Sequence, residues 1–235
     1  MTDVLFSGEF EPDPDEPNEL SGQAKVLLAD EKLKGARLMI RQLDAQSGEY
    51  NGQPVTATAF EAEFHPAPTT RFAHVSIMLE FLSPKHTKVL DLVPKYVDDI
   101  APRTIEITRR GDLGLEFVPI NVAIGTEHRT AFEVIPTISQ ASGELSSEVQ
   151  WTFKAASQVE ELPRQSTLGV MLSGSGPFKV RLEATAGVVS TGLAGAAQAG
   201  RDLIIGPPGK RMIRNVFEFP RLIQQKKKGL LTWIG

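Results

Sequence analysis

Two stretches decide the fold: Glu148–Ala155, which reads EVQWTFKA, and Phe178–Ala186, which reads FKVRLEATA. Their apolar positions alternate with polar ones and are Val149, Trp151, Phe153 and Ala155, then Phe178, Val180, Leu182, Ala184 and Ala186. Side chains on a strand point to opposite faces in turn, so strict alternation predicts strands with one face on a core and one in water. We expect Trp151 to form the centre of the core, with its indole N–H hydrogen-bonded.

The segment between these stretches contains Thr167–Leu172 and then the cluster Ser173–Pro177, which reads SGSGP. Glycine supplies positive φ and proline interrupts strand pairing, so the cluster predicts a hairpin turn. Ser47–Pro54 reads as a further loop.

Alternating or apolar runs predict more strands along the chain. They lie at Val4–Phe10, Leu20–Ala29, Arg37–Leu43, Phe60–Phe64, Val75–Phe81, Thr87–Val93, Ile105–Ile107 and Val216–Phe219. A change of phase within Leu113–Ile124 predicts a β-bulge near Phe117–Pro119 or a strand that crosses between sheets.

These patterns predict an all-β protein, an antiparallel β-sandwich of about ten short strands with a short C-terminal helix. The helix is expected at Pro220–Lys228, because proline suits its first turn and Gly229 its end. We expect residues 1–235 to form one domain, with an acidic, proline-rich loop at 11–19 and a C-terminal extension at 187–235 packed on it.

The composition narrows the chemistry. The chain has 235 residues, enough to bury a sizeable core, and no cysteine, which removes disulfides and thiolate nucleophiles. Met1–Phe10 has neither a basic segment nor a long apolar run, so we expect no signal peptide. No run approaches the roughly 20 apolar residues of a membrane-spanning helix, and we expect a cytoplasmic protein.

The charges are unevenly distributed along the chain. Residues 1–31 carry nine acids and one base, whereas residues 201–235 carry eight bases and two acids. The candidate binding residues are the basic ones near the C-terminus: Lys210, Arg211, Arg214, Arg221, Lys226, Lys227 and Lys228. Such a cluster indicates either an anionic partner or two chain ends that lie together and neutralise each other.

No catalytic motif is present. Residues 206–211 read GPPGKR, which lacks the first glycine and the serine or threonine of a phosphate-binding loop. No Gly-x-Ser-x-Gly elbow occurs. We therefore expect no cofactor and no catalytic residue, and we favour a non-enzymatic binding or assembly module whose partner is another protein or a second copy.

Two alternatives stay open. A peripheral membrane protein would use the small, uncharged residues 184–200 and the basic tail against an anionic surface. A metal-dependent enzyme would use His65 and His74, brought together across neighbouring strands, with Glu63 as a third ligand. Nucleic acid is disfavoured, because stacking aromatics are sparse in the basic tail.

Overall fold

The computed structural model describes residues 3–12, 35–68, 70–84, 86–97, 103–110, 112–119, 130–134, 138–154, 162–190 and 210–219. Within these ranges the chain forms fifteen β-strands and no helix, which confirms the all-β prediction. Several strands are longer than expected, and the longest have 14 residues. None of the described residues belongs to a helix that is long and apolar enough to cross a bilayer. The helix expected at Pro220–Lys228 lies outside the described residues.

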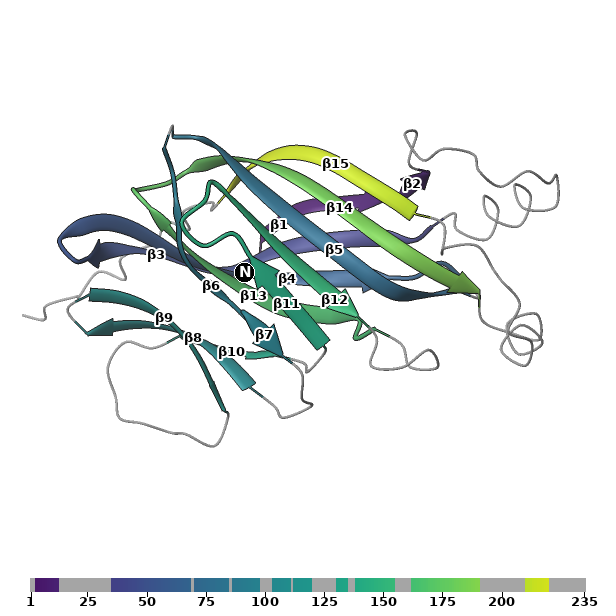
Figure 1. Cartoon of the computed structure of the whole chain (residues 1–235), viewed down its shortest axis with the longest axis horizontal. Coiled ribbons are helices and arrows are strands. Elements are labelled where there is room, and N and C mark those ends of the chain that lie inside the picture. Colours follow the sequence, from purple (N-terminus) through teal and green to yellow (C-terminus); the bar gives the residue numbers. More distant parts are fainter. Residues whose placement is uncertain are drawn as a thin grey trace, which may run out of the picture.

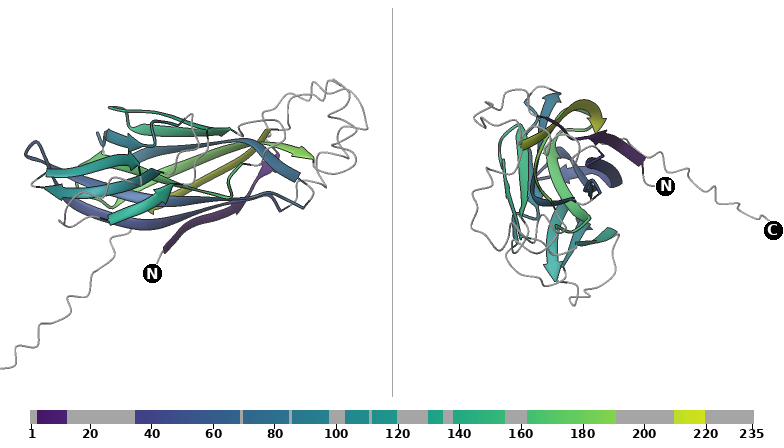
Figure 2. Two further views of the ribbon diagram at one scale, coloured as in Figure 1. Left: turned by 90° about the horizontal axis from the view of Figure 1, so that it is seen from below. Right: turned by 90° about the vertical axis from the view of Figure 1, so that its right-hand side faces the viewer.

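A seven-stranded antiparallel sheet contains both of the deciding stretches. Its order is β2 (Glu11–Pro12), β15 (Lys210–Phe219), β14 (Phe178–Ser190), β5 (Thr70–Ser83), β12 (Glu148–Lys154), β11 (Ile138–Ser142) and β7 (Tyr96–Val97). Its long strands run along the longest dimension of the molecule (Figures 1 and 2). The apolar residues of β12 and β14 are buried and most of their neighbours are not, as the alternation predicts.

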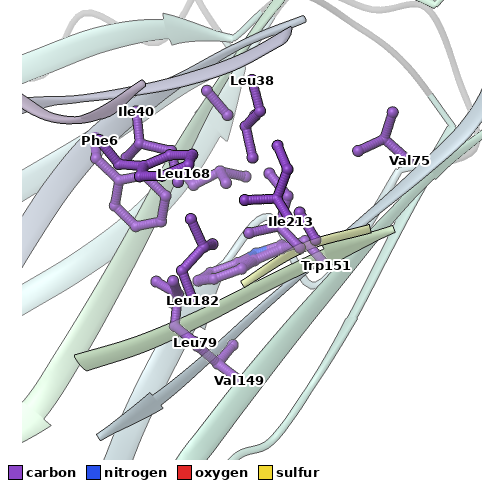
Figure 3. Packing of buried hydrophobic residues seen from close by; sticks show 14 of the residues in the cluster. Phe6, Leu38, Ile40, Val75, Leu79, Val149, Trp151, Leu168, Leu182 and Ile213 are labelled. Carbon is purple, nitrogen blue, oxygen red and sulfur yellow. The ribbon is translucent and has the colours of Figure 1, made fainter. Parts of the chain in front are cut away.

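A five-stranded antiparallel sheet packs against it and completes the sandwich. Its order is β1 (Asp3–Glu9), β3 (Arg37–Tyr50), β4 (Gln53–His65), β13 (Gln165–Ser173) and β6 (Val89–Val93). Side chains from both sheets fill the space between them (Figure 3). Trp151 is the largest fully buried side chain and meets Phe60 of the opposite sheet edge to face, with ring centroids 5.6 Å apart. Its Nε1 has no hydrogen-bond partner among the described residues, so the predicted hydrogen bond is not found there.

A third, three-stranded sheet covers part of the outer face of the five-stranded sheet. Its order is β10 (Thr130–Val134), β8 (Arg103–Arg110) and β9 (Asp112–Pro119). A second apolar cluster forms at this contact and comprises Val55, Ala57, Ala59, Val93, Ile105, Ile107, Leu113, Leu115 and Met171. Residues 55–60 of β4 are consequently buried on both faces.

The cluster Ser173–Pro177 does not form a hairpin. The strand before it, β13, pairs with β4 and β6 in one sheet, whereas β14 pairs with β5 and β15 in the other. The cluster therefore carries the chain across the sandwich. Turn residues show that the chain bends, but they do not determine which strand becomes the next hydrogen-bonding partner.

Two other local predictions are also corrected. Most of the loop expected at Ser47–Pro54 is strand, because β3 and β4 are joined by the two-residue turn Asn51-Gly52, with φ of 51° and 69°. Positive φ at both positions matches the twist of the flanking strands. The expected bulge near Phe117–Pro119 is absent from the β8–β9 pairing, whose register is regular from Arg110 and Asp112 to Arg103 and Pro119.

At each lateral side of the sandwich, two consecutive strands belong to different sheets. On one side β1 belongs to the five-stranded sheet and β2 to the seven-stranded sheet, and the amide of Phe10 between them donates to the Ala36 carbonyl at 2.8 Å. On the other side β6 and β7 do the same. That second side is held further by main-chain bonds from Val89 to Ser146 and from Leu145 to Val89, at 2.8 and 2.7 Å.

Candidate binding surface

The predicted basic residues fall partly within β15. Lys210 and Arg211 form the start of the strand, and Arg214 lies on its outer, solvent-facing side. The Arg214 side chain is 55% exposed, and its Nε contacts Glu183 Oε2 of β14 at 3.2 Å. Arg221, Lys226, Lys227 and Lys228 lie outside the described residues. Arg214 is thus the one predicted binding residue whose side chain is placed by the structure.

The main-chain edge of β15 is paired over only part of its length, and β1 passes close to the strand without pairing with it. On one side the strand pairs with β14 over its whole length, from Lys210 to Phe219, without a register shift. On the other side β2 pairs only with Arg211 and Met212. No described strand pairs with the outward side of Ile213–Phe219, which we call the β15 edge. This edge lies along the upper border of the molecule in Figure 1.

Alternation along β15 separates two sets of side chains. Ile213 is opposite Ala184 and is buried in the core, and Phe217 packs partly against the same core. Arg214, Val216 and Glu218 point to the outer face and are exposed, Val216 by 48%. Asn215 is in the core-facing phase, opposite Leu182, yet it is exposed. The five-stranded sheet therefore does not cover the inner face of the seven-stranded sheet at this position.

Charges on the outer face form cross-strand rows that end at β15. One row places Glu183 of β14 opposite Arg214, and another places Lys179 opposite Glu218. Between them Arg181 lies opposite Val216, and its Nη1 contacts Glu80 Oε2 of β5 at 2.6 Å. Opposite charges directly across a strand pair attract, so these rows support the register of the sheet.

The β1 edge is less suited to accept a strand. The pairing of β1 with β3 shifts register between Val4 and Phe6, so that Leu5 is an extra residue. Such bulges twist an edge strand and protect it against further pairing. Val4 is 45% exposed and in this respect resembles Val216, but it lies next to the bulge of β1, whereas β15 has no bulge.

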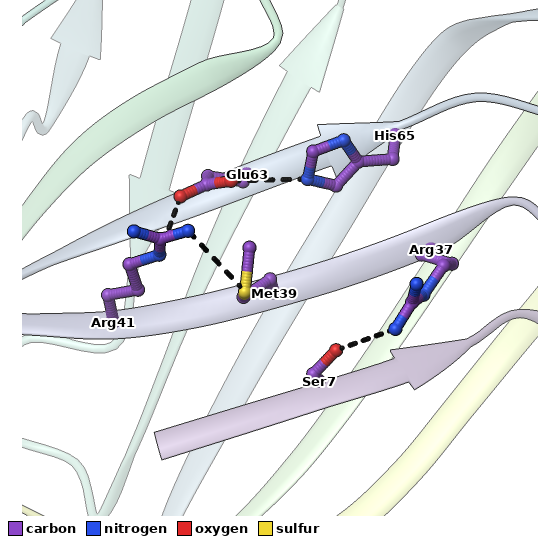
Figure 4. A network of polar contacts seen from close by, with 6 residues as sticks. All are labelled: Ser7, Arg37, Met39, Arg41, Glu63 and His65. Carbon is purple, nitrogen blue, oxygen red and sulfur yellow. Dashed lines mark hydrogen bonds and ion pairs between the residues drawn. The ribbon is translucent and has the colours of Figure 1, made fainter. Parts of the chain in front are cut away.

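A second polar cluster occupies the uncovered part of the five-stranded sheet's outer face (Figure 4). Arg41 Nε lies 2.7 Å from Glu63 Oε1, and His65 Nε2 lies 3.1 Å from Glu63 Oε2. Burial, then the neighbouring charge of Glu63, raises the pKa of the Glu61 carboxyl above its usual value. The cluster is a partly buried set of polar contacts in which the Arg41–Glu63 ion pair joins β3 to β4.

The histidines predicted as metal ligands are not brought together. His65 ends β4 in the five-stranded sheet, whereas His74 belongs to β5 in the seven-stranded sheet, opposite Lys154 and Gly187. Burial and then the Lys154 charge lower the pKa of the His74 imidazole. Nowhere in the described part of the chain do three histidine, aspartate or glutamate residues gather as a metal site would require. The expected pairing of His65 and His74 across neighbouring strands is therefore wrong.

The first part of the segment proposed to meet a membrane, residues 184–200, is not at the surface. Ala184 and Ala186 are fully buried in β14, where they pack in the sandwich core, so they are not available to a surface. Residues 191–200 lie outside the described residues, and for them the hypothesis stays a prediction. The two oppositely charged chain ends do meet, because Glu11 and Pro12 of β2 pair with Met212 and Arg211.

A comparison with protein-family models finds no match, and a comparison with curated protein sequences finds none either. Among solved structures, the chain is similar to Clostridium perfringens delta-toxin, with a TM-score of 0.40 and 9% identity, over 76% of this chain and 88% of the toxin. It is also similar to a protein described as a pore forming protein, with a TM-score of 0.43 and 6% identity, over 93% of this chain and 91% of that one. A third likeness is to the Clostridium perfringens NetB toxin in its membrane inserted form, with a TM-score of 0.31 and 6% identity, over 78% and 85% of the two chains. At these TM-scores and identities the likenesses assign neither a family nor an activity to this chain.

Proposed function

We propose that this protein is a non-enzymatic binding or assembly module that joins another polypeptide by adding a strand at the β15 edge. The observation that supports this proposal is the outward side of Ile213–Phe219, along which no described strand forms a ladder with β15. An extended segment added to a sheet edge gains main-chain hydrogen bonds, and side chains on the two faces then select the partner.

Three properties of the edge support this role. It is regular over seven residues, because β15 has no bulge, and it contains no proline. It presents an exposed valine between two opposite charges, Arg214 and Glu218. It also rests on a rigid base, since β14 is held on its far side by the 14-residue strand β5.

A photo-crosslinking amino acid placed at Val216 tests the proposal in cells that produce the full chain. We expect crosslinks from position 216 to a polypeptide that mass spectrometry identifies, either this chain or another. The matched control is the same probe at Val4, which is similarly exposed but lies on the bulged strand β1. Equal crosslinking from both positions, or none from position 216, would contradict the proposed function.

A further inference from the structure

We infer that the strand received at the β15 edge is the β15 of a second copy of this chain, paired antiparallel about a two-fold axis at Val216. This inference rests on the proposed function, because it names the partner of the same edge. Ile213–Phe219 reads IRNVFEF. Antiparallel pairing centred on Val216 places Arg214 opposite Glu218 of the second copy, and Glu218 opposite Arg214 of the second copy.

The faces of the two sheets agree in this arrangement. Residues directly opposite in an antiparallel pair point to the same face, and Arg214, Val216 and Glu218 all point outward. A two-fold axis through Val216 and perpendicular to the sheet therefore keeps the outer face of each copy on the same side. The two seven-stranded sheets would continue into each other through a self-complementary, isologous contact.

The charges extend the match beyond the two strands themselves. Glu183 already lies opposite Arg214, and Lys179 already lies opposite Glu218. Across the join each outer row then reads Glu183, Arg214, Glu218 of the second copy and Lys179 of the second copy, with alternating sign. The central row places the two Val216 side chains against each other, flanked on each side by Arg181 and its partner Glu80. Opposite charges and apolar side chains directly across a strand pair are the stabilising combinations.

Other registers lose this complementarity. A shift that centres the axis on Asn215 or Phe217 faces one of the two charged residues with Val216, so no ion pair forms. A shift by a single residue places outward side chains of one copy against core-facing side chains of the other. The centre at Val216 is the register in which Arg214 and Glu218 meet twice.

Charge reversal gives a test in which two defective variants repair each other. Arg214→Glu sets two pairs of carboxylates against each other in its own dimer, and Glu218→Arg sets two pairs of guanidinium groups together in the same way. In a mixed dimer of the two variants, the introduced carboxylate at position 214 of one copy faces the introduced guanidinium at position 218 of the other. The other position pairs the original Arg214 with the original Glu218, so both contacts attract.

Sedimentation velocity of the full chain, over roughly 1–300 µM, measures the association. We expect a concentration-dependent dimer for the wild type. Each variant alone should associate about tenfold or more weakly, and the equimolar mixture should associate nearly as well as the wild type.

Several results would overturn the inference: a wild type that stays monomeric over this range, variants that dimerise as well as the wild type, or a mixture that stays monomeric. Circular dichroism and thermal melting of each variant show whether it is folded, and Val4→Lys serves as a charge-changing control that should still dimerise. A monomeric wild type whose probe at position 216 crosslinks to a different polypeptide refutes the second-copy inference and leaves the proposed function standing. Absence of any crosslink at position 216 removes both.

Discussion

Gly169 gives the most direct test of how the three-stranded sheet is held. In β13 this glycine lies opposite Val93 of β6, on the face that β8 and β9 cover. A Cβ added at this position would lie 2.7 Å from Val93 Cγ2, 3.1 Å from Leu115 Cδ1 and 3.3 Å from Ile105 Cγ2. Contacts this short force the neighbouring side chains to move, so the absence of a side chain is what lets the three-stranded sheet approach.

The expected cost of Gly169→Ala follows from two opposing effects. Overpacking a well-filled core by one methyl group costs about 1–3 kcal/mol. Replacing glycine stabilises by about 0.4–1 kcal/mol, because the unfolded chain loses conformational freedom. Overpacking is the larger effect, so the free energy of unfolding should fall by about 1–2 kcal/mol.

Urea titration and hydrogen exchange provide the assay. The urea midpoint should fall by about 0.5 M. In the variant, amide hydrogen exchange should accelerate in β8 and β9 more than in β12. Val93→Ala removes the nearest contact, so the double variant should lose less stability than the sum of the two single changes. A Gly169→Ala protein as stable as the wild type, or strictly additive changes, would refute this account of the packing.

Three further outcomes are expected. Trp151→Ala should lower the free energy of unfolding by about 3–5 kcal/mol in urea titration, and Trp151→Phe should cost clearly less, because it removes an indole N–H that lacks a partner among the described residues; equal losses would contradict this. The lowered pKa of His74 means that the unfolded chain binds a proton more tightly, so stability should be full above the usual pKa of 6.5 and fall as the pH drops below it. His74→Gln should flatten that slope below about pH 6.5, and an unchanged slope would count against burial as the cause. The raised pKa of Glu61 has the opposite sign, so its contribution is present below the usual 4.5 and lost as the pH rises. Glu61→Gln should therefore raise the stability near pH 7, because it removes a partly buried charge and then the repulsion from Glu63, and thermal melting near pH 4 should show no gain.

The faces of the strands could be read from the sequence, but their partners could not. Alternation placed Trp151 and Leu182 in the core because burial on a strand has a period of two residues, a purely local property. The pairing of β2 with β15 joins residues about 200 positions apart, and no local pattern encodes it. For the same reason SGSGP was interpreted as a hairpin although it links two sheets.

The candidate surface was only partly predictable. Arg214 was chosen for its charge, and it does lie on the outer face of β15. Val216 and Glu218 were missed as binding residues, because their value depends on β15 having an open edge. The symmetry of Arg214, Val216 and Glu218 is visible in the letters RNVFE. It becomes significant only once the pairing of β2 with β15 is known to stop at Met212.

The placement of β2 has a consequence for biosynthesis. Residues 11–12 leave the ribosome about 200 residues before their pairing partners, residues 211–212. Strand β1 can pair early with β3, but the pairing of β2 must wait until β15 has been synthesised. The sandwich therefore closes late on that side, and a chain interrupted before residue 211 would lack the pairing partner of β2.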